Sequence, residues 1–561
     1  MRPYNIANVP TTVGSSRALP ESAMNRRDFL HAGAALAAAP ALSFADDTKA
    51  GETLYNGIKL PSPWPPKWKD VPADLGEPPY LKAPPAVIPI DLGRQLLVDD
   101  FLIEKTDLAR TFHAPTPHKD SPVLRPETAW EREGAAPMAM VFSDGVWYDP
   151  KDKLFKMWYM GGYGRSVCLA RSEDGVRWDR PELDVKRGTN VVHPGPRDSA
   201  TVWLDHDATD PKQRFKLFLS HSEGGRFGQS VYYSADGVHW GERVVRTGST
   251  GDRTTAFYNP FRKVWVYSTR HGWGVPRRRR YWETPDLVKG PQWEKIDEPG
   301  MWAAADAQDP PRADLKTPPQ LYNLDCVAYE SLVLGLFSIW RGDLNVPPGR
   351  PKPNNVCAGF SRDGFHWSRP DRRAFIDVSE AKGDWNWGNV QSAGGCCLVV
   401  GDELYFYHSG RAGKPGAADG KGRDGAGSTG LAVLRRDGFA SLDATDKGGT
   451  VTTRPVTFAG KHLFVNADAR DGELTAEVID GDGKALDGLS AADCVAVRAD
   501  GTRQAVGWKA GDLGTAAGKP VRLRFHLKKA RLFAFWVSGE KAGASGGYVA
   551  AGGPGLTNRD A

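Results

Sequence analysis

Acidic residues beside arginines recur at corresponding places along this 561-residue chain. Glu133, the pair Arg197-Asp198 and the pair Asp252-Arg253 stand close to three successive apolar runs, and Asn323, Asp325 and Gln391 stand at two later runs. Carboxylates that a fold brings together can act as general acid and general base, because one can stay protonated while the other is ionised. Each has an equally good structural interpretation, as the ion-pair partner of a neighbouring arginine. Their meaning depends on the elements that position them.

A short phrase, S-x-D-G-x-x-W, recurs between these places. It stands at 172–178, 234–240 and 361–367, with degenerate copies at 283–287 and 435–439. Aromatic and β-branched runs of strand composition precede each copy. In its Asp-Gly turn, the glycine can adopt positive φ and the aspartate can accept bonds from backbone amides. Five copies of one four-stranded antiparallel unit predict a five-bladed β-propeller, with structural roles for the aspartate and tryptophan of the motif.

The chain divides into five predicted parts. Residues 1–45 are an export signal, and 46–90 form a Pro-rich N-terminal arm that packs on the main domain. The propeller is expected over 91–445. Short alternating strands with Asp-Gly turns predict a small β-sandwich over 446–540. The Gly/Ala-rich tail, 541–561, is expected to be disordered.

The N-terminus has the pattern of a twin-arginine signal. Arg26-Arg27 precede an alanine-rich apolar stretch and then Ser43-Phe44-Ala45, a small-x-small cleavage site. The apolar stretch is too short to span a membrane. The mature protein is therefore expected to be periplasmic or extracellular, with no membrane span.

Composition excludes some classes of partner. The net charge is +5 and the basic residues are spread along the chain, so no nucleic-acid partner is expected. None of the six cysteines has zinc-ligand spacing, and no metal site or cofactor is predicted. A structural calcium stays open, and the sequence indicates no oligomeric state.

The export leader, the five repeated phrases and the C-terminal sandwich together resemble the five-bladed propeller glycoside hydrolases of families 32, 43, 62, 68 and 117. The segment Leu-Leu-Val-Asp-Asp-Phe-Leu-Ile-Glu at 96–104, followed by Arg-Thr-Phe-His at 110–113, is similar to exported family-32-like proteins. The resemblance covers roughly residues 91–540. It implies an exported hydrolase that acts on a poly- or oligosaccharide through acidic residues in a central funnel.

The resemblance also implies roles for the acidic residues. In that superfamily, carboxylates at the starts of the innermost strands flank the glycosidic bond. The implied nucleophile or base is Glu133, the implied acid is Asp252, and Asp198 would stabilise the transition state. Candidate substrate-binding residues are Arg197, Arg253, Asn323, Asp325, His271, Gln391 and Trp387, and Asp325 or His271 could replace Asp252 as the acid.

The chain departs from the family pattern in two places. It lacks Asn-Asp-Pro-Asn-Gly in the first unit and Glu-Cys in the third. These differences argue against a retaining fructosidase and favour an inverting route. Two alternatives stay open: a non-catalytic carbohydrate-binding propeller, and a glycoside phosphorylase in which Arg253 or residues 277–280 bind phosphate.

Overall fold

The computed structural model describes residues 51–72, 75–271, 276–342, 353–413 and 425–561. The signal predicted over 1–45 lies outside them. Within the described residues, the one α-helix is the short α1 (Pro79–Lys82), and strands account for almost all regular structure. The prediction of an all-β protein is therefore confirmed. All six cysteines are free and buried.

Five sheets follow one another along the chain. The first contains β6 (Ala139–Met140), β7 (Val146–Asp149), β8 (Leu154–Gly161), β9 (Ser166–Ser172) and β10 (Val191–His193). The second contains β11 (Ala200–Leu204), β12 (Phe215–Glu223), β13 (Arg226–Ser234) and β14 (Arg243–Arg246). The third contains β15 (Thr255–Asn259), β16 (Val264–Arg270), β17 (Arg279–Thr284) and β18 (Gly300–Ala303).

The last two sheets also recruit strands from the ends of the chain. The fourth contains β19 (Gln320–Glu330), β20 (Leu332–Trp340) and β21 (Asn354–Ser361), with β34 (Tyr548–Val549) paired to β19. The fifth contains β22 (Asn389–Ser392), β23 (Leu398–Val400), β24 (Glu403–Arg411) and β25 (Gly427–Arg435). Its outer strand is β5 (Thr116–Pro117), which pairs with β25.

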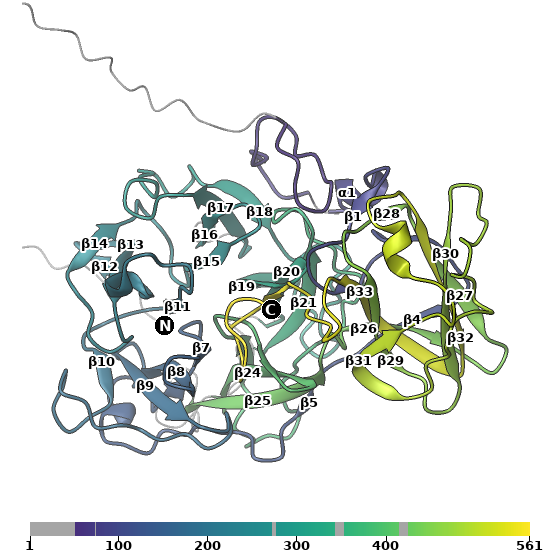
Figure 1. Ribbon diagram of the computed structural model, residues 1–561. Coiled ribbons are helices and arrows are strands. Elements are labelled where there is room, and N and C mark those ends of the chain that lie inside the picture. Colours follow the sequence, from purple (N-terminus) through teal and green to yellow (C-terminus); the bar gives the residue numbers. More distant parts are fainter. Residues whose placement is uncertain (1–50, 73–74, 272–275, 343–352, 414–424) are drawn as a thin grey trace, which may run out of the picture. The chain divides into compact units, whose positions relative to one another are not determined.

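The five sheets are arranged around a common centre (Figure 1). Strands of successive sheets contact one another in turn, from β7 to β11, β15, β19 and β22, and β23 contacts β7 again. Because both faces of each sheet pack against neighbours, strands such as β8 are buried almost throughout instead of alternating. The ring brings the beginnings of five segments, far apart in sequence, to one place.

The repeated phrase forms the turn that its residues predict. Ser172 Oγ accepts a hydrogen bond from the Gly175 amide at 2.8 Å, and Asp174 Oδ1 accepts from two following amides. Gly175 has φ +75°, which only glycine adopts without strain. The same bonds recur around Asp236 and Asp363.

The degenerate copy at 435–439 differs. Asp437 has φ +59° and its carboxylate is buried against Arg94, Tyr329 and Asn466. Here the aspartate joins distant segments instead of closing a local turn.

Two further sheets contain most of the C-terminal region. One contains β31 (Asp500–Val506), β29 (His462–Asp468), β33 (Ala530–Ser538), β26 (Ala440–Ala444), β4 (Ala109–Phe112) and β2 (Gln95–Leu96). The other contains β3 (Ile103–Thr106), β27 (Gly449–Thr453), β32 (Arg522–Lys528) and β30 (Glu473–Ile479).

These pairings change the predicted boundaries of the propeller. The residues of β2, β3, β4 and β26 fall within the predicted 91–445 unit. However, β2 and β26 pair with β33, β3 pairs with β27, and β4 joins the same sheet as β33 through β26. The prediction was wrong there because a short strand pattern does not identify the partner strand.

The predicted disorder of 541–561 is also wrong. Tyr548 and Val549 form β34, and Asp560 is buried in an ion pair with Arg436. Glycines in this segment, such as Gly546 at φ +65°, permit tight turns rather than indicating disorder.

The segment from 51 to 90 has little regular structure. Its β1 (Ile88–Pro89) pairs in parallel with β28 (Val456–Thr457). The Tyr55 hydroxyl donates to the Ser331 carbonyl, and Asn56 donates to the Arg362 carbonyl. Three short 3₁₀ helices lie elsewhere, at η1 (Trp130–Arg132), η2 (Pro211–Gln213) and η3 (Leu513–Ala516).

Candidate functional site

The ends of the innermost strands carry most of the residues nominated from the sequence. Asp198 lies two residues before β11, and Arg253 lies two residues before β15. Asn323 and Asp325 lie within β19, and Gln391 lies within β22. Because β11, β15, β19 and β22 contact one another in turn, these residues lie at the starts of or within adjacent strands.

Asp198 is joined to the neighbouring sheet through Arg253. Its Oδ1 accepts a hydrogen bond from the Arg253 backbone amide at 2.7 Å. Arg253 has φ +56°, an uncommon conformation for a residue with a side chain. Burial raises the pKa of Asp198, and the neighbouring carboxylate of Asp252 raises it further, against the opposing effect of Arg253. Asp198 thus keeps its proton to a higher pH than an ordinary aspartate does.

Asp252 has different surroundings. Its carboxylate forms an ion pair with Arg270 and lies 3.7 Å from Nη1 of Arg277. Its side chain keeps 19% of its surface exposed. The two neighbouring aspartates therefore differ chemically: Asp252 is ion-paired with Arg270, and Asp198 is a buried carboxyl group with a raised pKa.

Arg197 binds an acid that the sequence analysis missed. Both of its terminal nitrogens donate to the Asp144 carboxylate, and both side chains are buried. Burial raises the pKa of Asp144, and Arg197 opposes this shift. Asp144 stands in Ser143-Asp144-Gly145, a polar interruption of an apolar run that separates β6 from β7. That interruption was the available signal.

Asp325 lies in a buried polar cluster. Its Oδ2 accepts hydrogen bonds from Ser392 Oγ at 2.6 Å, Asn323 Nδ2 at 2.8 Å and Ser143 Oγ at 3.2 Å. Gln391 donates to Asn389 at 3.4 Å beside this cluster. The cluster joins three sheets, because its members come from the first, fourth and fifth.

Glu133 and His271 lie outside the described contacts of Asp198 and Asp252. Glu133 is exposed, and no described contact joins its carboxylate to Asp198 or Asp252. His271 Nδ1 accepts from Arg280 Nε at 3.0 Å, and burial together with Arg280 lowers the pKa of its ring. Trp387 is half-buried in the loop ahead of β22. The structure thus brings together Asp198, Asp252 and the buried arginines, without Glu133.

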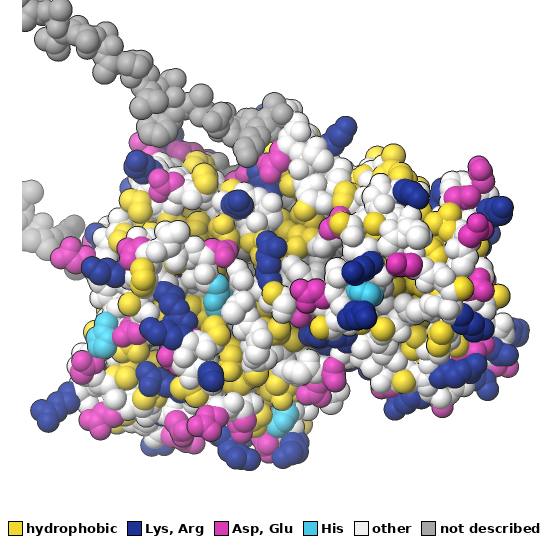
Figure 2. Space-filling model, in the orientation of Figure 1, with side chains coloured by type: hydrophobic (Ala, Val, Ile, Leu, Met, Phe, Trp, Pro, Cys, Tyr) yellow, Lys and Arg dark blue, Asp and Glu magenta, His cyan; other side chains and the backbone are white. Residues whose placement is uncertain are grey.

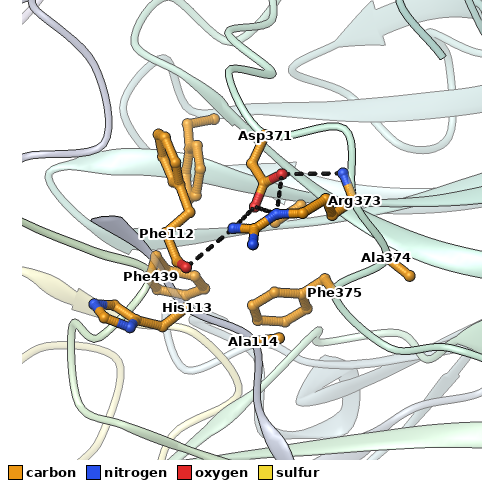
Figure 3. Close-up of a pocket in the computed structure, with 10 residues that line it drawn as sticks. Phe112, His113, Ala114, Asp371, Arg373, Ala374, Phe375 and Phe439 are labelled. Carbon is orange, nitrogen blue, oxygen red and sulfur yellow. Dashed lines mark hydrogen bonds and ion pairs between the residues drawn. The ribbon is translucent and has the colours of Figure 1, made fainter. Parts of the chain in front are cut away.

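A separate pocket of about 130 Å³, shown in Figure 3, has none of these residues in its lining. Aromatic rings of Phe112, Phe375 and Phe439 line it. Asp371 pairs there with Arg373, which also donates to the Phe112 carbonyl at 3.2 Å. Burial would raise the pKa of Asp371, but the hydrogen bonds from Arg373 lower it. The only carboxylate in this lining is committed to an arginine, so the pocket lacks a pair of acids for acid–base chemistry.

Other site types find no support in the part of the chain that the structure describes. It contains no group of three or more His, Cys, Asp or Glu residues arranged to hold a metal ion. No helix there has the length and apolar character to cross a bilayer. Positive and negative side chains are interspersed on the face shown in Figure 2.

Comparison with known proteins finds one family model that matches the chain. Residues 23–43 match the TAT (twin-arginine translocation) pathway signal sequence, as predicted from Arg26-Arg27 and the apolar stretch after them. No curated protein matches the chain.

Solved structures of carbohydrate-active proteins are similar at low identity. An N-acetylgalactosamine deacetylase from F. plautii, in complex with blood group B trisaccharide, is 14% identical, with a TM-score of 0.37 over 62% of this chain and 97% of that one. A thermostable family-43 glycoside hydrolase is 12% identical, with a TM-score of 0.37 over 54% and 92%. A fructofuranosidase variant from Schwanniomyces occidentalis, complexed with fructosylnystose, is 13% identical, with a TM-score of 0.34 over 75% and 96%. Likeness at this level assigns neither family nor substrate.

Proposed function

We propose that this protein is an exported glycoside hydrolase built on a five-bladed β-propeller with a C-terminal β-sandwich. Its substrate would be an oligo- or polysaccharide. The protein would act on it in the periplasm or outside the cell, after export by the twin-arginine route. The observation that carries the proposal is the pair Asp198 and Asp252, neighbouring carboxyl groups in contrasting environments at the centre of the ring.

The contacts support an acid–base division between these two residues. Asp198, whose pKa is raised by burial and by Asp252, would protonate the leaving group. Asp252, ion-paired with Arg270, would act as the carboxylate that activates water. This division differs from the resemblance-based roles, in which Asp252 is the acid and Asp198 stabilises the transition state. The resemblance places the base at Glu133, whose exposure argues against that role.

The remaining central acids would support the reaction indirectly. Asp144 holds Arg197, and Asp325 organises Asn323 and two serines. Asp144 is held by both terminal nitrogens of Arg197 and Asp325 by three donors, which suits positioning or substrate recognition better than proton transfer. No metal or cofactor is part of this proposal.

A second candidate is a glycoside phosphorylase. The buried arginines around Asp198, chiefly Arg253 and Arg279, favour it because phosphorolysis needs a site for inorganic phosphate. The two candidates differ in whether glycan cleavage requires phosphate.

A glycan panel tests both candidates. The mature protein is incubated with neutral and acidic oligosaccharides, with and without inorganic phosphate, and new reducing ends and sugar phosphates are measured. We expect reducing ends without added phosphate, and their loss in a folded Asp198→Asn variant. The control is Asp371→Asn, which changes an ion-paired aspartate of the separate pocket. A fully active Asp198→Asn variant would refute the proposed acid, and cleavage that depends on phosphate would favour the phosphorylase.

A further inference from the structure

Arg253 carries a buried charge that lacks hydrogen-bond acceptors. The residue is 1% exposed, and its guanidinium carbon lies 3.5 Å from the centroid of the Phe142 ring. Among the described residues, none accepts a hydrogen bond from Nε, Nη1 or Nη2. An aromatic ring covers one flat face of a guanidinium but accepts nothing from the five N–H groups at its edge. A buried cation in this condition is costly unless a ligand supplies acceptors.

The neighbouring carboxylates are engaged elsewhere. Asp198 accepts from the backbone amide of Arg253 and not from its side chain. Asp144 is held by Arg197, and Asp325 accepts from Asn323, Ser143 and Ser392. The protein therefore attracts the Arg253 side chain electrostatically through these acids without satisfying its N–H groups.

Arg279 adds a second cation beside the first. It is fully buried, its Nη2 donates to the Arg253 carbonyl at 2.8 Å, and its Nη1 has no acceptor among the described residues. Burial and the charge of Arg253 lower the pKa of Arg279 to about 9. Two close, buried cations repel one another, and an anion between or beside them would relieve that repulsion.

We propose that Arg253, supported by Arg279, binds an oxyanion carried by the glycan substrate, such as the carboxylate of a uronic acid or a sulfate ester. Guanidinium groups match such groups through paired N–H donors. Because Asp198 bonds to the amide of Arg253 itself, the bound anion would lie close to the proposed acid. Beside this centre, the side chains of Asp252 and Arg277 are 19% and 13% exposed.

The inference names the class of glycan for the proposed function. It rests on that proposed function only for the assumption that a sugar carries the bound anion. It predicts that a charged substituent, rather than the ring alone, selects the substrate. The same oxyanion chemistry could come from free phosphate, so the experiment must separate the two sources.

Binding measured without turnover tests the site. The mature protein is titrated calorimetrically with glucuronate, galacturonate, glucose and galactose, and separately with inorganic sulfate and phosphate at constant ionic strength. We expect at least one uronate to bind about tenfold or more tightly than its neutral counterpart, a difference worth about 1.4 kcal/mol. Arg253→Met should abolish this preference, and Arg253→Lys should retain part of it. Arg498→Met, which changes an exposed arginine paired with Glu473, is the control and should keep it.

The outcomes separate the possible errors. Equal binding of uronates and neutral sugars would overturn the inference, and so would a preference that persists in folded Arg253→Met. Binding of phosphate alone would overturn the substrate-borne anion and favour phosphorolysis. If Arg253→Met does not fold, the comparison of uronates with neutral sugars on the unaltered protein still tests whether the site prefers an anionic sugar. Uronate binding without any cleavage would contradict the proposed hydrolase and leave the anion site standing.

Discussion

Asp198 Oδ1 accepts a hydrogen bond from the backbone amide of Arg253 at 2.7 Å. This bond joins residues that precede β11 and β15, the first strands of two adjacent sheets. It fixes a buried carboxyl group with a raised pKa near Asp252, which is ion-paired with Arg270. The left-handed backbone at Arg253 turns its amide toward that carboxylate. The relationship therefore sets the geometry on which the proposed chemistry depends.

Replacing Asp198 by asparagine should remove activity while preserving the fold. The amide oxygen can still accept from the Arg253 amide, but the side chain can no longer deliver a proton. We expect a decrease in kcat of about 10²- to 10⁴-fold. The measurement is initial rate on the best glycan from the panel, with circular dichroism to establish folding. A loss of less than threefold would contradict the assignment of the acid.

The pH dependence should report the raised pKa of Asp198. As a general acid it works only when protonated, so kcat should fall as pH rises through that pKa. In Asp252→Asn the nearby negative charge disappears, which lowers the pKa of Asp198 and should move this limb to lower pH. The same variant should lose rate if Asp252 is the base. If the residual kcat of Asp252→Asn fell over the same pH range as that of the unaltered protein, the proposed electrostatic effect of Asp252 on Asp198 would be contradicted.

The raised pKa of Asp198 also predicts how the stability of the folded protein depends on pH. Folded Asp198 binds its proton more tightly than the unfolded chain does, since its pKa is raised. Its contribution to stability is therefore full below the unfolded pKa and is lost as pH rises through the folded pKa. Asp198→Asn should reduce the change in unfolding free energy over that pH window, as measured by denaturant titration at several pH values. The same pH dependence in both proteins would count against the raised pKa.

The variant Glu133→Gln tests whether Glu133 has the catalytic role that the family resemblance implies. The resemblance implies a nucleophile or base at this position, whereas the side chain is exposed and has no described contact with the central acids. We expect kcat within about threefold of the unaltered protein, because surface substitutions away from the reacting groups have small effects. A loss comparable to that of Asp198→Asn would restore the resemblance-based role.

Local chemistry explains what could be predicted from sequence. The turn at Ser172, Asp174 and Gly175 is predictable because its hydrogen bonds join residues two or three apart. Repetition of that turn predicts repeated sheets, and the acids ahead of each apolar run include Asp198 and Asp252.

Contacts between distant residues explain what was missed. The partner of Arg197 is Asp144, which lies in the preceding sheet and inside an apolar run that reads as one strand. Strand β4 pairs with β26, more than 300 residues away, and nothing in the local sequence of β4 identifies that partner. The buried cluster around Asp437 likewise depends on Arg94 and Asn466, which no local pattern connects.

The C-terminal segment, which was expected from the sequence to be disordered, should contribute to the stability of the folded protein. Asp560 is 3% exposed, pairs with Arg436 at 2.9 Å and lies 3.7 Å from Arg94. Glu330 shares Arg436 at 3.0 Å, so the penultimate residue completes a buried network that includes the end of β19. Asp560→Asn removes one negative charge and leaves Arg436 and Arg94 partly uncompensated, at a cost of about 3 kcal/mol. We expect a lower denaturant midpoint, whereas Asp482→Asn, at an exposed turn, should leave the midpoint unchanged. Equal midpoints for the two variants would mean that the network does not stabilise the folded protein.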